Sequence, residues 1–159
     1  MAIVTARAPA DPAGRAAPEP SLLEGYRLED QVGFHLRRAM QRHSAIFSER
    51  MAAELTGTQW AALVKVAELG CVSQNHLGRE TAMDAATIKG VVDRLIKRGF
   101  VKANADPTDS RRSLITLTDD GRAVMAGAAS AARAITEATV EPLTQGERQM
   151  LVELLRKIS

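Results

Sequence analysis

The sequence predicts a mainly helical fold with one small β-hairpin, and three observations lead to that prediction. Apolar residues recur at helical spacing over most of the chain between positions 28 and 158. The spacing becomes strand-like only between Phe100 and Thr118. Ser, Thr or Asp stands before several helical stretches, where a side-chain oxygen can accept from unpaired backbone N–H groups.

The N-terminal region divides into a tail and a long helix. Residues 1–20 are rich in Ala and Pro and hold few bulky apolar side chains, so we expect a disordered tail. The length of the remainder, 21–159, fits a single domain. Its first element is expected to be a helix from Leu28 to about Leu55, too long for a small globule unless it packs on something else.

Two further helices are expected after this one. Thr58 is expected to cap the first of them and Gly70 to end it. Ser73 then caps a short helix, Gln74 to about Glu80.

The next helix carries a clear amphipathic pattern. Asp84 is its expected N-cap, Lys97 and Arg98 occupy its last turn, and Gly99 ends it. The apolar residues at helical spacing are Ile88, Val91, Val92, Leu95 and Ile96.

A β-hairpin is expected after Gly99. Phe100 to Asn104 reads as one strand and Leu114 to Thr118 as its partner, with the turn "ADPTDSRR" between them. This places Arg111 and Arg112 at a hairpin tip, where an acidic partner outside the protein would explain them.

Two helices complete the chain. Thr118 is the expected N-cap of an Ala-rich helix that runs to about Val140. Thr144 and Glu147 form a capping box for the last helix. The apolar residues of this helix that we expect to face inward are Met150, Leu151, Leu154, Leu155 and Ile158.

Composition narrows the function classes. The net charge is only +2, but the window 89–112 holds seven basic residues and three acidic ones, a local charge of +4. The one cysteine, Cys71, excludes an internal disulfide and a multi-cysteine zinc site. With no run of about 18 apolar residues and no secretory signal, we expect a cytoplasmic protein without cofactor or metal.

Two short helices followed at once by a basic hairpin form a winged helix-turn-helix, which binds duplex DNA. The second helix of this motif enters the major groove, and the hairpin reaches the flanking minor groove or the backbone. Lys97 and Arg98 are expected to contact phosphate, while Lys89 reads bases. The predicted DNA-binding residues are Ser73, Gln74, Asn75, Ala86, Thr87, Lys89, Gly90, Arg94, Lys97, Asp109, Arg111 and Arg112.

Other functions remain open from the residues alone. The outer face of the second helix could be merely solvated. Three histidines and a cysteine could serve an enzyme, but no Gly-rich phosphate loop, H-E-x-x-H or paired-carboxylate motif is present, so we expect no catalytic residue. A helical adaptor is the other alternative, although it would not need arginines at a hairpin tip.

The motifs "VVDRLIKRGFV" (Val91 to Val101) and "DSRRSLITLT" (Asp109 to Thr118) resemble those of the MarR family of transcription regulators, and the resemblance covers about residues 28–158. It implies that Arg111 enters the minor groove, that Asp109 orients it, and that Thr87 is the recognition-helix hydroxyl. Lys89 and Gly90 depart from the family pattern, where a hydroxyl residue and an arginine are common.

The same resemblance implies a homodimer that binds a palindromic site. Residues 28–55 and 119–159 would form the dimer, and residues 57–118 the DNA-binding lobe. Two recognition helices about 34 to 36 Å apart would read half-sites one turn apart.

The segment "DQVGFHLRRAMQRHSAIF" (Asp30 to Phe47) resembles regulators of aromatic-acid catabolism, including nicotinate catabolism. It implies a repressor released by a small aromatic acid such as 6-hydroxynicotinate. A ring slot with a cationic rim would suit such a ligand. The predicted effector-binding residues are His35, Arg38, His43, Phe47 and Trp60.

Three alternatives to an aromatic-acid effector site remain. His43 could be a core histidine with its hydrogen bonds satisfied, and the arginines could be surface or dimer charges. The regulator could instead sense oxidation through Cys71, or answer to an aromatic acyl-CoA thioester.

Overall fold

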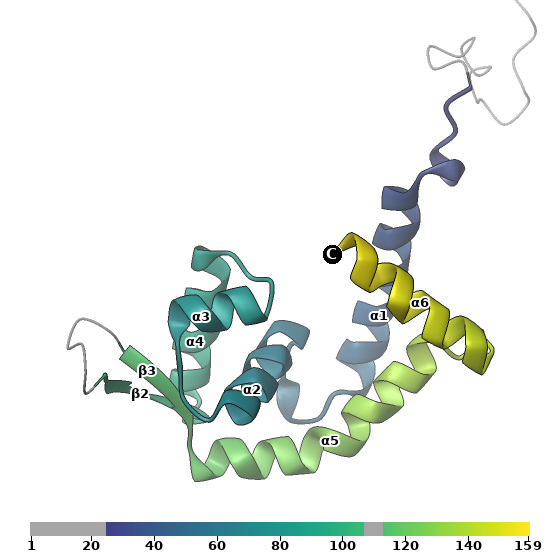
Figure 1. Ribbon diagram of the computed structural model, residues 1–159. Coiled ribbons are helices and arrows are strands. Elements are labelled where there is room, and N and C mark those ends of the chain that lie inside the picture. The colour runs from purple at the N-terminus through teal and green to yellow at the C-terminus, as the bar shows by residue number, and fades with distance from the viewer. Residues whose placement is uncertain (1–24, 107–112) are drawn as a thin grey trace, which may run out of the picture. The chain divides into compact units, whose positions relative to one another are not determined.

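A computed structural model describes residues 25–106 and 113–159 (Figure 1). The chain divides into two compact units, Met1–Arg38 and Ala39–Ser159. The predicted tail 1–20 lies outside the described residues, as do Asp109, Arg111 and Arg112. The elements are η1 (Leu28–Asp30), α1 (Val32–Arg50), η2 (Ala52–Glu54), α2 (Gly57–Leu69), β1 (Val72–Ser73), α3 (Gln74–Glu80), α4 (Ala85–Lys97), β2 (Val101–Ala105), β3 (Ser113–Leu117), α5 (Asp119–Thr139) and α6 (Gln145–Ile158).

The first long helix is shorter than predicted. Leu28–Asp30 form a separate 3-10 turn, and Gln31 after it is extended. At the other end, α1 stops at Arg50 because Met51 is extended, with φ −72° and ψ 123°. The prediction of one helix from Leu28 to Leu55 is therefore wrong at both ends.

The bend after α1 is held by a residue distant in the sequence. Ala53 and Glu54 have positive φ values of 58° and 49°, which a continuous helix cannot accommodate. Their carbonyl oxygens accept hydrogen bonds from the guanidinium of Arg98. The bend also lets Met51 and Leu55 bury their side chains in the core.

Helix α2 begins two residues earlier than its predicted cap implied. Thr56, not Thr58, is the N-cap: its Oγ1 accepts from the backbone N–H of Gln59, and the Gln59 side chain accepts from the backbone N–H of Thr56. Gly70 ends the helix with φ 71°, as predicted.

Other helix boundaries confirm the sequence prediction. Ser73, Asp84, Thr118 and Thr144 are the N-caps of α3, α4, α5 and α6. Gly99 follows α4 with φ 74°. The largest fully buried side chains of the core are Leu63, Leu77, Ile88, Leu95, Ile115, Ile135, Val66 and Val91.

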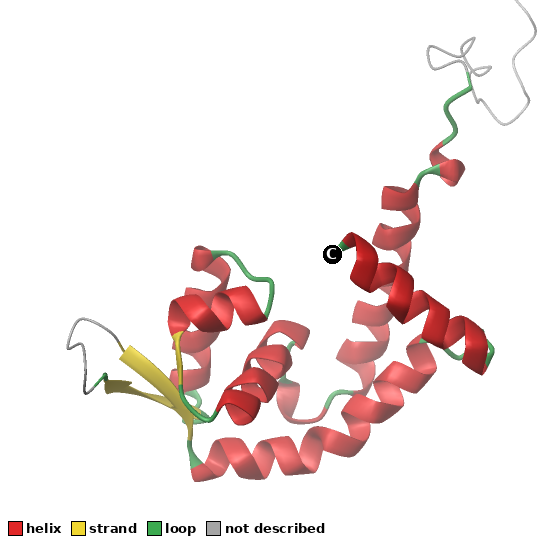
Figure 2. Cartoon of the chain, viewed as in Figure 1, coloured by secondary structure: helices red, strands yellow, loops and turns green. Residues whose placement is uncertain are grey.

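The strands form a three-stranded antiparallel sheet in the order β1-β3-β2 (Figure 2). The hairpin prediction is correct to within one residue, with Val101 opposite Leu117. The sequence did not predict β1, whose two residues pair with Ile115 and Leu114. Because β1 directly precedes α3, its pairing with β3 holds the start of α3 next to the hairpin.

The last helix differs from its prediction in exposure. The capping box of Thr144 and Glu147 is present, but no residue of α6 is buried. The apolar residues predicted to face inward are exposed in the single chain: Met150, Leu151, Leu154, Leu155 and Ile158. Within the described ranges, none of the helices is long and apolar enough to cross a membrane.

Candidate DNA-binding surface and effector pocket

Helices α3 and α4 meet at a tight turn. Gly78 of α3 is buried, and a β-carbon there would stand 3.1 Å from the carbonyl oxygen of Met83 and 3.2 Å from Ile88 Cγ2. The backbone N–H of Met83 donates to the Gly78 carbonyl over 2.9 Å. Glycine therefore allows the close approach that sets the angle between the two helices.

The start of α4 is fixed by Asp84. Its carboxylate accepts from the backbone N–H of Thr87 over 2.8 Å and from the Thr87 hydroxyl over 3.0 Å. The backbone N–H of Thr87 holds the pKa of Asp84 below its usual value, and the side-chain bond from Thr87 adds to this effect. The cap therefore stays ionised at neutral pH. Because the Thr87 hydroxyl proton is donated to Asp84, only the lone pairs of its oxygen remain to accept a further hydrogen bond.

The outer face of α4 presents small and charged residues. Ile88, Val92 and Leu95 are buried, as predicted. The exposed side of the helix carries Ala86, Thr87, Lys89, Asp93, Arg94 and Lys97, with Gly90 partly exposed. The ammonium of Lys89 lies 2.6 Å from a carboxylate oxygen of Asp93, an exposed pair that contributes little to stability.

The other predicted DNA contacts differ in accessibility. Asn75 of α3 is exposed, while Ser73 and Gln74 are partly buried at its N-terminus. The Ser73 hydroxyl oxygen accepts from the backbone N–H of His76 and is thus used as a cap.

Arg98, predicted to contact phosphate, has partners within the chain. Besides its two bonds to the carbonyls of Ala53 and Glu54, its guanidinium lies 4.7 Å from the centre of the Phe100 ring.

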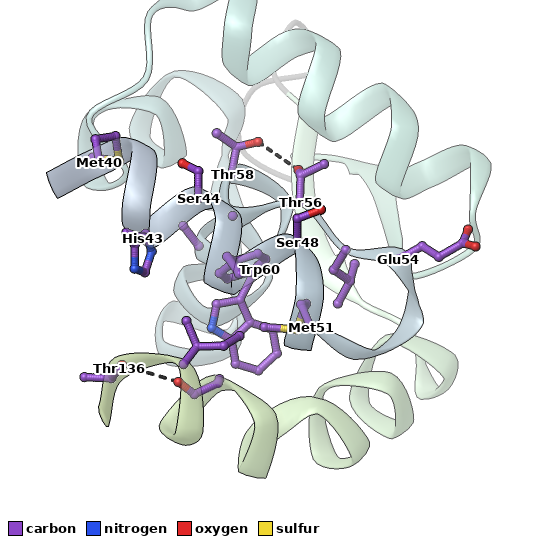
Figure 3. A pocket seen from close by; sticks show the side chains of 16 residues that line it. Met40, His43, Ser44, Ser48, Met51, Glu54, Thr56, Thr58, Trp60 and Thr136 are labelled. Atoms are coloured by element: carbon purple, nitrogen blue, oxygen red, sulfur yellow. Dashed lines mark hydrogen bonds between the residues drawn. The ribbon is translucent and has the colours of Figure 1, made fainter. Parts of the chain in front are cut away.

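A cavity of about 890 Å³ opens inside the unit Ala39–Ser159 (Figure 3). His43, Phe47 and Trp60, three of the predicted effector residues, all line it. The other lining residues are Met40, Ser44, Ser48, Met51, Glu54, Leu55, Thr56, Gly57, Thr58, Ala61, Ala132, Ile135 and Thr136. The cavity thus combines an apolar floor with several hydroxyl groups.

His43 is held in a defined hydrogen-bonding state. Its Nδ1 lies 3.0 Å from the hydroxyl oxygen of Thr139, and that hydroxyl donates to the Ile135 carbonyl over 2.8 Å. Because the Thr139 proton is used, the hydrogen-bond network assigns a proton to Nδ1. Nε2 is therefore an acceptor in the neutral ring and a donor in the imidazolium.

The charges of the lining are few. His43 is the one lining residue that can carry a positive charge, and Glu54 is the one carboxylate. The ring centres of His43 and Phe47 lie 6.0 Å apart at an angle of 56°, so the two lining rings form a tilted pair.

His35 and Arg38 belong to the unit Met1–Arg38 and are both exposed. A ring nitrogen of His35 is hydrogen-bonded with the carbonyl of Glu29, and the Arg38 guanidinium lies 5.6 Å from the centre of the Phe34 ring.

The sequence did not point to the part of the lining that comes from the α1–α2 linker and α5. The T-x-x-Q pattern of Thr56 and Gln59 could have located the start of α2. No local pattern distinguishes Ile135 and Thr136, which line the cavity only through the packing of α5. The described residues hold no group of three or more His, Cys, Asp or Glu side chains that could bind a metal ion.

Comparison with known proteins identifies relatives of this chain. A profile of the MarR family matches residues 55–113. The HTH-type transcriptional repressor NicR of Pseudomonas putida is 40% identical over 134 residues, which cover 84% of this chain and 85% of NicR.

Two solved structures share the fold. A probable transcriptional regulator from Pseudomonas aeruginosa has a TM-score of 0.82 and 50% identity, covering 84% of this chain and all of that one. BpsR of Bordetella bronchiseptica, whose DNA binding is regulated by 6-hydroxynicotinic acid, has a TM-score of 0.81 and 40% identity, covering 84% of this chain and 96% of BpsR. With its winged helix-turn-helix of α3, α4 and the β2–β3 hairpin, this chain belongs to the MarR family of transcriptional regulators, which are not enzymes.

Proposed function

We propose that the protein is a homodimeric repressor that leaves a palindromic operator when a small aromatic acid occupies the 890 Å³ cavity. The acid would be a hydroxylated aromatic or heteroaromatic monocarboxylate, with 6-hydroxynicotinate as the first candidate. The observation that carries the proposal is the joint presence of His43, Phe47 and Trp60 in one cavity.

The exposed face of α4 supports DNA binding. Lys89, Arg94 and Lys97 are all exposed on the helix that follows the tight turn. A recognition helix needs such cations for phosphates and base edges, and small residues such as Ala86 where its backbone approaches the bases. From the sequence we also propose that Arg111 enters the minor groove and that Asp109 and Arg112 assist it, although these residues lie outside the described ranges.

The exposed apolar residues of α6 support a dimer. Met150, Leu154 and Ile158 are 53%, 51% and 66% exposed, which is unusual for side chains that recur on one helix face. Val32, Leu36 and Met40 of α1 are exposed as well. Dimerisation, which is typical of the MarR family, would remove these surfaces from water.

The cavity suits an aromatic acid in size and chemistry. Pockets for small ligands commonly measure about 300 to 1,000 Å³, are mostly apolar and contain a few polar groups. Phe47 and Trp60 offer ring surfaces, and His43 in its imidazolium form would offer a charged donor for a carboxylate. NicR is a repressor and BpsR responds to 6-hydroxynicotinic acid, which favours this acid among aromatic acids.

His35 and Arg38 remain proposed partners of the carboxylate on the strength of the sequence pattern. Substituting these residues one at a time separates their contribution to binding of the acid from that of His43. If Arg38 binds the carboxylate, its removal weakens binding of the acid but not of an uncharged analogue.

Calorimetry with 6-hydroxynicotinate and its amide tests the proposed ligand. We expect the acid to bind the wild type at least about tenfold more tightly than the amide, which corresponds to the loss of one charge-assisted contact. His43→Ala and Arg38→Ala should each reduce this preference. Gln41→Ala is the control, since Gln41 is exposed on α1 and does not line the cavity.

Two results would contradict the assignment. Equal binding of the acid and the amide would show that the carboxylate does not contribute to binding. Unchanged binding in both His43→Ala and Arg38→Ala would show that the ligand binds at another site. Binding of an aromatic acyl-CoA thioester alone would identify the arginines of α1 as phosphate partners instead.

A further inference from the structure

The linker between α1 and α2 forms part of the cavity wall. Glu54 and Leu55, like Thr56 after them, line the cavity. Ala53 and Glu54 both have positive φ, at 58° and 49°. Residues with a β-carbon rarely adopt this conformation, and two in succession need support from the surrounding structure.

Arg98 supplies that support from the end of the recognition helix. It is the C-cap residue of α4, and its backbone N–H donates to the Arg94 carbonyl over 3.0 Å. Its guanidinium donates to the Glu54 carbonyl over 3.2 Å and to the Ala53 carbonyl as well. One side chain thus joins the cavity wall to the last turn of α4.

The guanidinium is itself oriented by a neighbour. Phe100 lies under it, with 4.7 Å between the guanidinium carbon and the ring centre. The ring covers one face of the planar fork, whose Nη1 and Nη2 donate to the adjacent carbonyl groups of Glu54 and Ala53. A displacement of the linker by about 1 Å would lengthen or misalign these hydrogen bonds.

We infer that Arg98 is a positioning residue that couples occupancy of the cavity to the placement of α4, and that it is not a phosphate contact. This inference rests on the proposed function. A ligand that displaces Glu54 and Leu55 moves the carbonyl groups that Arg98 binds, and the last turn of α4 follows. Since coupling is reciprocal, operator binding must also lower the affinity of the cavity for its ligand, and through Arg98 we expect it to shift the cavity wall.

The first test compares operator affinity with and without 6-hydroxynicotinate, on a duplex selected from a random pool by repeated binding. In the wild type the acid should weaken operator binding by a factor of about 10 or more, within the usual range of allosteric coupling. In Arg98→Gln this factor should fall to about 2 or less. Arg98→Lys retains the charge but cannot fork onto both carbonyls, so its factor should lie between the two.

Lys97→Gln is the matched control, because Lys97 is an exposed cation one position earlier in α4. It should weaken operator binding with and without the acid and leave their ratio unchanged. It should also reduce the magnitude of the slope of log affinity against log salt concentration by about 0.9. If Arg98→Gln behaves in this way instead, Arg98 is a phosphate contact and the inference is wrong.

A second readout does not depend on the effector. Trp60 is the chain's one tryptophan and lines the cavity, so its fluorescence reports on the cavity wall. Operator DNA should change acrylamide quenching of Trp60 in the wild type and in Lys97→Gln, but not in Arg98→Gln at saturating DNA. The milder Arg98→Lys gives the same comparison if Arg98→Gln does not fold.

The two readouts separate the inference from the proposed function. If 6-hydroxynicotinate does not bind the wild type, the proposed effector is wrong, and the Trp60 measurement still decides the role of Arg98. An equal change in quenching in the wild type and both Arg98 variants would overturn the inference even if the acid releases the operator.

Discussion

Gly121, in the first turn of α5, packs directly on the backbone of Phe100. A β-carbon at position 121 would stand 2.0 Å from the Phe100 carbonyl oxygen. That carbonyl accepts from the backbone N–H of Thr118 over 3.1 Å, so it cannot move without breaking the start of α5. The contact joins α5, which lines the cavity, to the segment that follows the recognition helix.

Gly121→Ala should therefore destabilise the protein by about 2 kcal/mol or more, because overpacking against backbone forces a shift of the chain. Gly127→Ala is the matched control in the same helix, since a β-carbon there meets nothing within 4 Å. The control should be neutral or stabilising by up to about 1 kcal/mol. Urea unfolding followed by circular dichroism measures both, and equal midpoints for the two variants would contradict the packing argument.

Lys89 and Lys97 should affect operator binding in different ways. Lys89 lies near the start of the exposed face of α4, where side chains reach base edges, so Lys89→Ala should change discrimination between operator variants by about 1 to 3 kcal/mol. Lys97→Ala should weaken binding to all sequences alike. Competition binding with single-base operator variants measures the difference, and the same loss on every sequence for both substitutions would refute it.

Arg111→Ala should remove most operator affinity while the dimer and the fold remain intact. The expectation comes from the sequence, which places Arg111 in the hairpin turn. Loss of one phosphate neutralisation should lower the salt slope by about 0.9. Fluorescence anisotropy on the selected operator measures both quantities, with Arg133→Ala on α5 as a control for the loss of one exposed charge. Wild-type affinity in the Arg111 variant would exclude this role.

Leu154→Glu should convert the dimer to a monomer and abolish tight operator binding. Leu154 is 51% exposed in the single chain, and a carboxylate there could not be buried in an interface without a large desolvation cost. Gln149→Glu adds the same charge on α6 and should leave the dimer intact. Sedimentation equilibrium gives the mass of each, and a dimeric Leu154→Glu variant would show that α6 does not form the interface.

Much of the fold could be predicted because its signals are local. Ser73, Asp84, Thr118 and Thr144 each accept from a backbone N–H three residues ahead, so a short stretch of sequence determines each cap. The hairpin is predictable for the same reason, since turn residues separate two short stretches with strand-like spacing.

The errors arose where distant residues decide the structure. Apolar spacing continues through Met51 and Leu55, yet the helix ends at Arg50, and the bend that follows is held by Arg98, more than forty positions away, which binds the carbonyls of Ala53 and Glu54. The two-residue strand β1 exists only through its pairing with β3.

The apolar face of α6 shows a second reason why sequence periodicity alone does not determine the structure. Its pattern indicates that Leu154 and its neighbours need a partner surface, but periodicity is the same whether that surface belongs to the same chain or to another. For the cavity, the pattern of α1 indicated His43 and Phe47, while Ile135 of α5 could be found only from tertiary packing.

The most direct test of the account measures the affinity of the wild-type protein for its selected operator by fluorescence anisotropy, with and without saturating 6-hydroxynicotinate. We predict that the acid raises the dissociation constant by a factor of about 10 or more, because it must bind the DNA-free form more tightly to release the operator. Nicotinamide, which lacks both the carboxylate and the ring hydroxyl, should have no effect. An unchanged dissociation constant in the presence of the acid would contradict the account.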